Sequence, residues 1–487
     1  MVEAMANSVE DYLIDGLSFK LAPGASYVTD RRSVTWYASG AQTYISNQGA
    51  RVIRLALNGE GWCDPSTVRL SYTLNNTATA VTGANAANTP ILRPIGGPWS
   101  LFSRVRCQYQ GAICDDISDY NRTHEMLEIL TSKPNRENSD VAGFGRRWDD
   151  NYYYPTNNIT GLDNTPYAGF VGAWANDGTL QKAFGGIMPG GSQSVSFKPL
   201  IGILNQNKYL PLMWGGFTMD FEIIGNATDA FIDGNSGSGL HFSTTNTSTT
   251  WSIQDIRMTG DVVTLDSALQ NSYAEHVLSG KSLPINYGTY ITMQQTVTGS
   301  NISVNVARAV SRLKTIFCSF NGDYSTDAIR LANFSYYYPK KEFNYFYHPM
   351  GLNLINENLG VFYDFTKELE FQVQIGSKMI PEYPIRSISE TYSQLKKALG
   401  IHSSPWHSIS PSYQQYLKDH FIIGIDCEKV LDASWTGLNT KAGQLLTVKL
   451  KGANNTIDSA IMPTKMYITL HSDNILEIRD SGASVYD

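Results

Sequence analysis

A strand–turn–helix arrangement occurs twice in this chain and constrains its fold more than any other feature. Residues 371–400 read FQVQIGSKMIPEYPIRSISETYSQLKKALG, and residues 101–130 read LFSRVRCQYQGAICDDISDYNRTHEMLEIL. Each copy has an alternating apolar–polar strand, a glycine, an irregular segment and a short helix. The repeat therefore predicts one module used twice, in two domains joined head to tail.

The helix of the second copy, predicted over 389–399, carries recognisable end signals. Ser387 or Ser389 is expected as its N-cap, and Gly400 as its stop. Before the helix, Pro381 and Pro384 bar an ordinary helix or a central strand, so this part is expected to be a turn. The two copies also agree in the spacing from glycine to helix, Gly111 to Glu125 and Gly376 to Glu390.

The rest of the chain reads as short strands separated by turns, with very few helices, which is typical of sandwiches and barrels. The fold class expected is all-β, with two tandem eight-stranded jelly rolls, short helices and long loop insertions at 132–192 and 321–368. The Gly-, Ser- and Thr-rich stretch after Gly225 suits a linker. The predicted division is an N-terminal leader at 1–30, jelly roll 1 at 31–225, a linker at 226–250 and jelly roll 2 at 251–487.

The charge balance argues against a large nucleic-acid-binding face. The chain has 37 Lys and Arg against 44 Asp and Glu, a net charge of −7, and its N-terminus is acidic. Only 17% of its residues are charged, against the usual ~25%. A surface poor in charge and rich in Tyr suits extensive protein contacts, although an all-β fold alone also favours Tyr and Thr.

The five cysteines are scattered and form no CxxC pair, which indicates neither a zinc site nor a disulfide framework. Reduced, buried thiols are expected, which favours assembly in a cytosolic or nuclear compartment. The sequence shows no signal peptide and no apolar run long enough to span a membrane. For that reason the eight N-glycosylation sequons are expected to be by-products of Asn- and Thr-rich loops.

Several stretches resemble one family, the double jelly-roll major capsid proteins of eukaryotic double-stranded DNA viruses, especially the Polinton-like and adintovirus-like group. The stretches that carry the resemblance are GWCDPSTVRLSYTL (61–74), SRLKTIFCSF (311–320), the module at 371–400, FIIGIDCEKV (421–430) with GLNTKAGQLLTVKL (437–450), and ILEIRDSGASVYD (475–487). The resemblance covers most of the chain in layout and is strongest from Phe371 onward. The acidic N-terminus departs from capsid proteins that have basic arms.

The resemblance implies a structural protein of the virion rather than an enzyme. It implies homotrimeric capsomers with a pseudo-hexagonal outline that tile an icosahedral shell, assembled in the host cytoplasm or nucleus. The implied partners are further copies of the chain, neighbouring capsomers and minor capsid or penton proteins. Neither strong direct nucleic-acid binding nor a transmembrane segment nor a cofactor is implied.

No catalytic or metal-binding constellation stands out in the sequence. GNSGS around Ser236 lacks the second glycine of a nucleophile elbow, and GGIMPGGS (185–192) has no lysine beside its serine, so a turn is favoured over a phosphate loop. His402 and His407 are separated by Pro405 and favour a surface loop over a metal pair.

Carboxylates offer three weaker candidates. In the pairs Asp115-Asp116 and Asp149-Asp150, adjacent side chains on an extended chain point opposite ways, so neither pair alone makes an acid–base couple, although the fold can bring a glycosidase-type pair together. Asp116 and Asp119 are candidate caps of the helix that follows. Candidate calcium ligands, in loops unlike an EF-hand, are Asp64, Asp426 and Glu428.

The alternative function is that of a jelly-roll protein that binds or acts on carbohydrate. Its support is two aromatic runs, residues 152–154 and 336–338, which can form a sugar-binding platform or pack between neighbouring subunits. A secreted lectin or hydrolase usually carries a signal peptide and disulfides, and this chain shows neither, so the shell protein is favoured.

Overall fold

The computed structural model describes the chain from residue 27 to residue 487, with internal gaps. Within that span the residues outside the description are 47–48, 50, 80–89, 91, 93, 146–186, 232–247, 322–345, 347, 350–368, 403–406, 419, 430–436, 442–444 and 453–463. Most of the predicted leader and most of both predicted insertions therefore lie outside the described residues.

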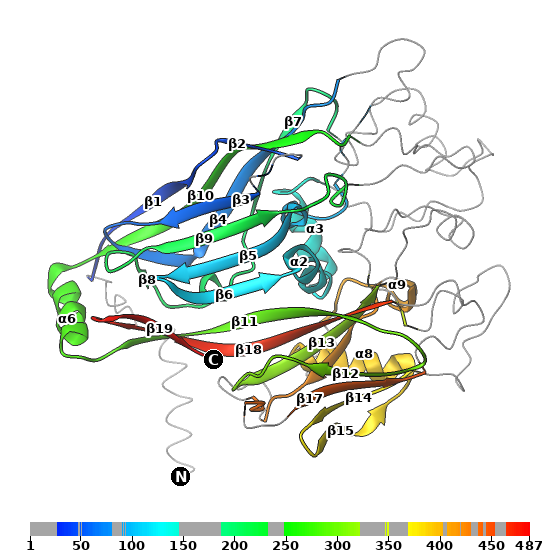
Figure 1. Cartoon of the computed structure of the whole chain (residues 1–487). Coiled ribbons are helices and arrows are strands. Elements are labelled where there is room, and N and C mark those ends of the chain that lie inside the picture. The colour runs from blue at the N-terminus through cyan, green and yellow to red at the C-terminus, as the bar shows by residue number, and fades with distance from the viewer. Residues whose placement is uncertain are drawn as a thin grey trace, which may run out of the picture.

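The first half of the chain forms a sandwich of two antiparallel sheets (Figure 1). Its strands are β1 (Val28–Ser39), β2 (Thr43–Ile45), β3 (Val52–Leu57), β4 (Trp62–Asn76), β5 (Phe102–Tyr109), β6 (Ala112–Ser118), β7 (Ser192–Phe197), β8 (Leu210–Pro211), β9 (Phe217–Ile223) and β10 (Trp251–Leu265). One sheet has the order β1-β10-β4-β7 and the other β3-β9-β5-β6. The two are joined because β1 crosses between them, with Ala38 already paired to Leu55 of β3.

Alternation along the strands builds the core of this sandwich. In β9 the side chains of Phe217, Met219, Phe221 and Ile223 are buried, and the residues between them are partly exposed. Successive side chains of a strand point to opposite faces, so an alternating sequence buries one face of each sheet against the other. The core also takes in Trp251 of β10, which is fully buried.

The second half forms another sandwich, with the same strand order. Its strands are β11 (Leu283–Thr296), β12 (Asn301–Val306), β13 (Leu313–Asn321), β14 (Glu370–Ile375), β15 (Lys378–Ile385), β16 (Ile423–Asp426), β17 (Leu446–Lys451), β18 (Lys465–Arg479) and β19 (Gly482–Tyr486). The sheets run β11-β18-β13-β16 and β12-β17-β14-β15, and β19 extends the first of them through β18. Apart from β19 and the short β2 and β8, the two sandwiches share one jelly-roll order, which confirms the predicted fold class.

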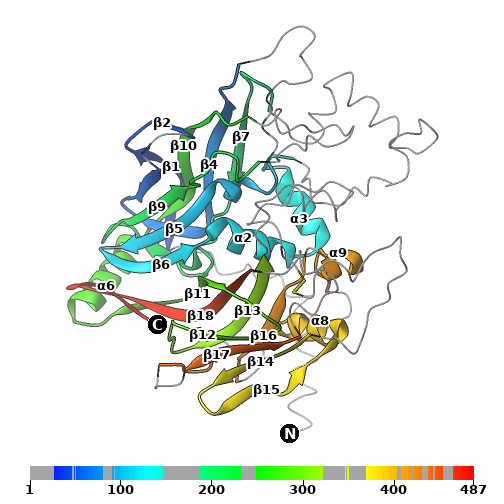
Figure 2. The same cartoon turned by 45° about the vertical axis from the view of Figure 1, so that its right-hand side comes forward.

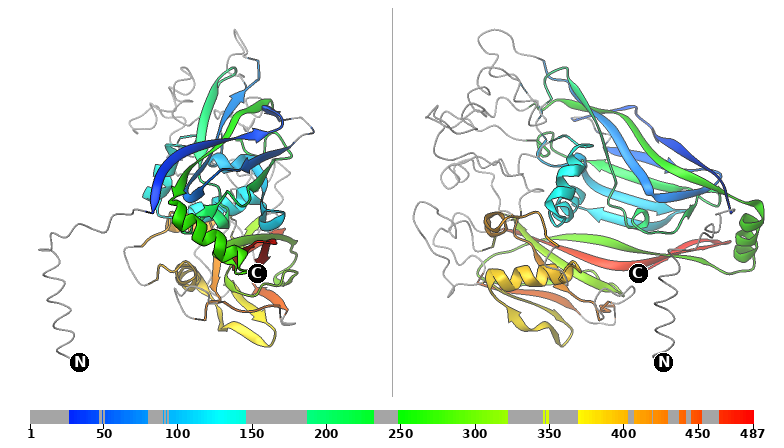
Figure 3. Two further views of the ribbon diagram at one scale, coloured as in Figure 1. Left: turned by 90° about the vertical axis from the view of Figure 1, so that its left-hand side faces the viewer. Right: turned by 180° about the vertical axis from the view of Figure 1, so that it is seen from behind.

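Short helices lie at the two ends of the molecule. They are α2 (Tyr120–Ile129), α3 (Lys133–Asp140), α6 (Ser267–Leu278), α8 (Ser387–Ala398) and α9 (Tyr413–Lys418), with the short 3-10 helices η2 (Pro98–Leu101) and η3 (Gly202–Leu204). α6 connects the sandwiches at one end, whereas α2, α3, α8 and α9 lie at the other (Figures 2 and 3). The Asp266 side chain caps α6 by accepting a hydrogen bond from the Ala268 N–H.

The repeated module is confirmed, but its middle part is a strand rather than an irregular segment. In each copy a two-residue turn closes an antiparallel hairpin, β5–β6 or β14–β15, and a helix follows. Gln110 and Gly111 take φ of +48° and +85°, and Gly376 takes +61°, as tight hairpin turns require. Pro381 and Pro384 fit a strand here because β15 lies at the edge of its sheet, where a missing N–H is tolerated.

The boundary between the domains differs from the predicted one. The sequence assigns everything after residue 250 to jelly roll 2, but β10 pairs along its length with β1 and β4 of the first sandwich. Residues 251–265 therefore belong to the first sandwich, and strand pairing places the division at α6. The local pattern missed this because a strand carries no mark of the sheet it joins.

Candidate functional site at the seam between the sandwiches

The second sandwich reaches onto the first with a ribbon of strands. Residues 283–289 of β11, 474–479 of β18 and 482–486 of β19 extend past the core of their own sandwich, and together they form what we call the seam ribbon (Figure 1). Its Ile285, Tyr287, Leu476 and Ile478 are buried in the core of the first sandwich. The first half of β18 instead belongs to the second core, so one long strand serves both sandwiches.

Polar groups lock the seam ribbon to β6 and η3. Tyr287 Oη donates a hydrogen bond to the carbonyl of Cys114 at 2.8 Å, and Thr289 Oγ1 donates to Asp115 Oδ1 at 2.5 Å. The backbones also meet closely, because a Cβ added at Gly202 would lie 2.0 Å from the carbonyl oxygen of Gly288. Only glycine fits at Gly202, so the seam is a tight and fixed contact.

Asp115 and Asp116 have opposite surroundings, as the extended chain predicts. Burial at the seam raises the pKa of Asp115 to about 6, although bonds from Thr289 and Ile203 act against that rise. Asp116 faces outward, where burial raises its pKa but the bonds from Arg104 and Arg106 outweigh it and hold the pKa below the ordinary value. The two carboxylates therefore form no acid–base couple, and Asp116 lies in β6 rather than capping α2.

The other half of the seam is formed by α2. Asp119 occupies its N-cap position with a left-handed backbone and makes no side-chain capping hydrogen bond. From α2, Arg122 inserts into the second sandwich, where Nη2 donates to Ser319 Oγ at 3.1 Å and to the Phe320 carbonyl at 3.3 Å. Its guanidinium also lies 4.1 Å from the centre of the Tyr467 ring. An arginine can be buried in this way because ring faces and carbonyl oxygens replace its water.

A buried ion pair connects α2 to α3. Glu125 Oε1 accepts from Arg136 Nη2 at 3.2 Å, and Oε2 accepts from Trp99 Nε1 at 2.8 Å. The side chains of Glu125 and Arg136 are 0% and 2% exposed, so the pair is desolvated. Because α3 leads into residues 146–186, this pair fixes the base of the first predicted insertion.

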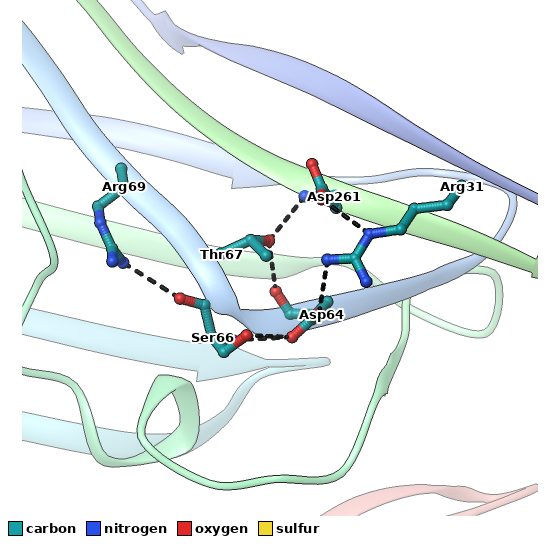
Figure 4. A network of polar contacts seen from close by, with 6 residues as sticks. All are labelled: Arg31, Asp64, Ser66, Thr67, Arg69 and Asp261. Carbon is teal, nitrogen blue, oxygen red and sulfur yellow. Dashed lines mark hydrogen bonds and ion pairs between the residues drawn. The ribbon is translucent and has the colours of Figure 1, made fainter.

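A second polar network lies on the outer face of the first sandwich (Figure 4). Arg31 of β1 donates to Asp64 at 3.0 Å and to Asp261 at 2.9 Å, which ties β1 to β4 and β10. Thr67 Oγ1 bridges the same strands by donating to the Asp64 carbonyl and accepting from the Asp261 N–H. Asp64 is thus neutralised by arginine, which does not match the predicted calcium ligand.

The remaining candidate ligands are also dispersed. Asp426 lies 3.8 Å from Lys397 Nζ, and Glu428 lies 3.3 Å from Lys314 Nζ, so both carboxylates face lysines. His402 and His407 are exposed residues on either side of an undescribed stretch. Within the described parts of the chain, no group of three or more His, Cys, Asp or Glu is arranged to hold a metal.

Several predicted features lie outside the described residues: Ser236, Asp149-Asp150, both aromatic runs, and the sequons at Asn158, Asn246, Asn333 and Asn454. Residues 187–192 are described and include the expected turn, with Gly190 at φ of +74°. Of the described helices, none is long and apolar enough to cross a membrane.

All five cysteines are buried and free, as predicted. Burial raises the pKa of Cys63 and of Cys318 to about 12 in each case, which keeps both thiols protonated at neutral pH.

The residues that make the seam were not singled out by the sequence, apart from Asp115. Arg122, Glu125 and Arg136 are charged residues in helices, where a solvated surface position is the ordinary expectation. The sequence of α2 offers no clear signal of this, because its apolar Met126 and Ile129 have the spacing of an ordinary surface helix.

No family model and no curated protein matches this sequence. Three solved structures that match over nearly the whole chain are 9 to 12% identical to it. The PBCV-1 protein VP54, fitted into a reconstruction of the virophage Sputnik, has a TM-score of 0.56 and 11% identity over 96% of this chain and 98% of that one. The structure of the Sputnik virophage has a TM-score of 0.53 and 12% identity over 96% of this chain and 90% of that one. The Faustovirus major capsid protein has a TM-score of 0.50 and 9% identity over 94% of this chain and 92% of that one.

Proposed function

We propose that this chain is the major capsid protein of an icosahedral virus, and that three copies form a capsomer with a pseudo-hexagonal outline. The observation that carries the proposal is the seam. Two jelly rolls of the same strand order are joined by buried strands, a buried arginine and a close glycine contact. Three chains can then supply six similar jelly rolls to one capsomer.

The likeness of fold supports this role. The match runs over 94% of this chain and 92% of a protein that is itself a major capsid protein, so the likeness includes both sandwiches and their connection. The proposed place of the protein is the virion, with neighbouring capsomers and minor capsid proteins as its partners. Its role is structural rather than catalytic.

Purified full-length protein tests the proposal. Light scattering should give three times the 53.9 kDa of one chain, and negative-stain images should show particles with a hexagonal outline. A well-folded protein that stays monomeric at micromolar concentration would contradict the proposal, because an obligate capsomer buries on the order of thousands of Å² between chains.

A further inference from the structure

Each sandwich extends a ribbon made from its first and last strands. In the second sandwich Leu283 of β11 pairs with Ile478 of β18, at the outer end of the seam ribbon. In the first sandwich Val28 of β1 pairs with Leu265 of β10 in the same antiparallel sense. Because the two sandwiches share one strand order, residues 28–34 and 260–265 form the counterpart of the seam ribbon, and we call them the free ribbon.

The two ribbons differ in what covers them. Tyr287 of the seam ribbon is 4% exposed because it lies against the first sandwich. In the free ribbon Tyr27, just before β1, and Val28 are 63% and 40% exposed, and residues 28–33 are exposed without interruption. From residue 28 to residue 37 β1 pairs only with β10 among the described strands, so its other edge is open. The β10 strand of the free ribbon is covered on its other side by β4, which pairs with it up to Val263, so it is the β1 edge that lacks a partner. An open strand edge is a template for pairing, and this one therefore calls for a cover.

The surface that could receive the free ribbon follows from the repeat. Within the chain the seam ribbon lies on β6, the second strand of the first hairpin–helix module. The matching strand of the second module is β15, which lies at a sheet edge. It exposes Tyr383 at 79% and leaves Met379 and Ile380 half-buried. An apolar edge strand of this kind is typical of a surface that is covered in the assembled protein.

We propose that the free ribbon of one copy docks on β15 of a second copy, and so repeats between chains the contact that the seam ribbon makes with β6 within one chain. This rests on the proposed function. Each chain offers one free ribbon and one free receiving strand, so the contact is head-to-tail and closes into a ring of alternating sandwiches. Three copies then bury every ribbon.

Two point variants test the contact on the full chain. Val28→Asp and Tyr383→Asp each place a charge where the proposal puts a buried apolar group, so each should weaken trimer association by ~10-fold or more in mass photometry over a dilution series. The matched control is Tyr413→Asp, because Tyr413 is 74% exposed on α9, away from both surfaces. The control should associate as the parent protein does, and all three should keep the parent circular dichroism spectrum.

Cross-linking gives a second readout that does not depend on destabilising variants. Chains carrying Arg32→Cys are mixed with chains carrying Glu382→Cys and treated with a short bismaleimide. A covalent pair of one chain of each kind is expected, and a double variant should give species of two and three chains. Ser303→Cys, at an exposed position of β12, replaces Glu382→Cys in the control and should give no pair.

The outcomes separate the two proposals. If the parent protein is trimeric but neither variant weakens it and no covalent pair forms, the docking surface is wrong and the capsid role stands. If the double variant links only within one chain, the ribbon is covered by its own chain and the docking surface is again wrong. A parent protein that never associates overturns both.

Discussion

The two hairpin–helix modules have the same local structure but opposite surroundings. β5–β6–α2 lies between the two sandwiches, with the seam ribbon on β6 and most of α2 buried. β14–β15–α8 lies at the outer edge of the second sandwich, where α8 buries only Thr391 and Leu395. The difference teaches that one local sequence pattern can be buried between two domains or exposed at an edge. The polar residues of the module distinguish the two cases.

Those polar residues make different bonds in the two copies. Glu125 of α2 holds a buried arginine and a buried tryptophan. Glu390 of α8 instead accepts a hydrogen bond from the Arg386 N–H at 2.7 Å, while Ser387 Oγ accepts from the Glu390 N–H at 3.3 Å. The predicted N-cap is wrong, because α8 begins at Ser387 and Arg386 occupies the N-cap position, although Ser387 Oγ still satisfies the N–H of Glu390. The first arrangement depends on distant residues, whereas the second needs only its neighbours.

The largest contrast is expected when each glutamate is removed. Glu125→Ala removes one partner of a buried ion pair, which should cost ~3–5 kcal/mol of unfolding free energy. Glu390→Ala removes one exposed cap contact and should cost about 0.5–1 kcal/mol. Urea unfolding at a fixed protein concentration measures both, since association would otherwise shift the midpoints. Equal losses of unfolding free energy in the two variants would show that Arg136 finds another partner or water. They would contradict the expected difference between the modules.

A smaller effect is expected from the pH dependence of Asp115. Its pKa rises from 3.8 to about 6 on folding, so the folded state binds the proton more tightly. The stabilisation is therefore complete below about pH 4 and is lost as pH rises through about 6, with a total near 3 kcal/mol. The melting temperature of the parent protein should accordingly fall between pH 5 and pH 7 more steeply than that of Asp115→Asn.

The adjacent carboxylate provides the control for this measurement. The pKa of Asp116 lies below its ordinary value, so its contribution is lost only as pH falls into the acid range. Asp116→Asn should therefore keep the parent slope between pH 5 and pH 7. If the melting temperature of Asp115→Asn falls between pH 5 and pH 7 as steeply as that of the parent protein, the pH dependence belongs to another group.

The smallest difference between the two modules is expected at the hairpin turns, where they should behave alike. Gly111→Ala and Gly376→Ala each place a Cβ on a backbone with positive φ, at a cost of ~1–2 kcal/mol. No atom lies within 4 Å of a Cβ at Gly111, so strain is the main cost there. Similar melting-temperature losses are expected, and a much larger loss for Gly111→Ala would mean that the turn is coupled to the seam.

The sequence by itself determined the all-β class, the two-fold repeat, and α8 to within two residues. These features are local, because alternation, capping residues and turn glycines act over a few neighbouring positions. It also determined that Asp115 and Asp116 point opposite ways. It missed β6 and β15 as strands. For β15 the reason is that proline is compatible with an edge strand, and nothing in its sequence marks it as an edge.

Only the tertiary structure decided which strands share a sandwich and which charges are buried. Thr289 and Asp115 are 174 residues apart, and Arg122 and Ser319 are 197 apart. A contact over such a separation leaves no periodic trace in either segment, because each residue satisfies its local strand or helix equally well without it. The seam therefore follows from how two finished sandwiches pack, and its polar bonds could not be read from either half alone.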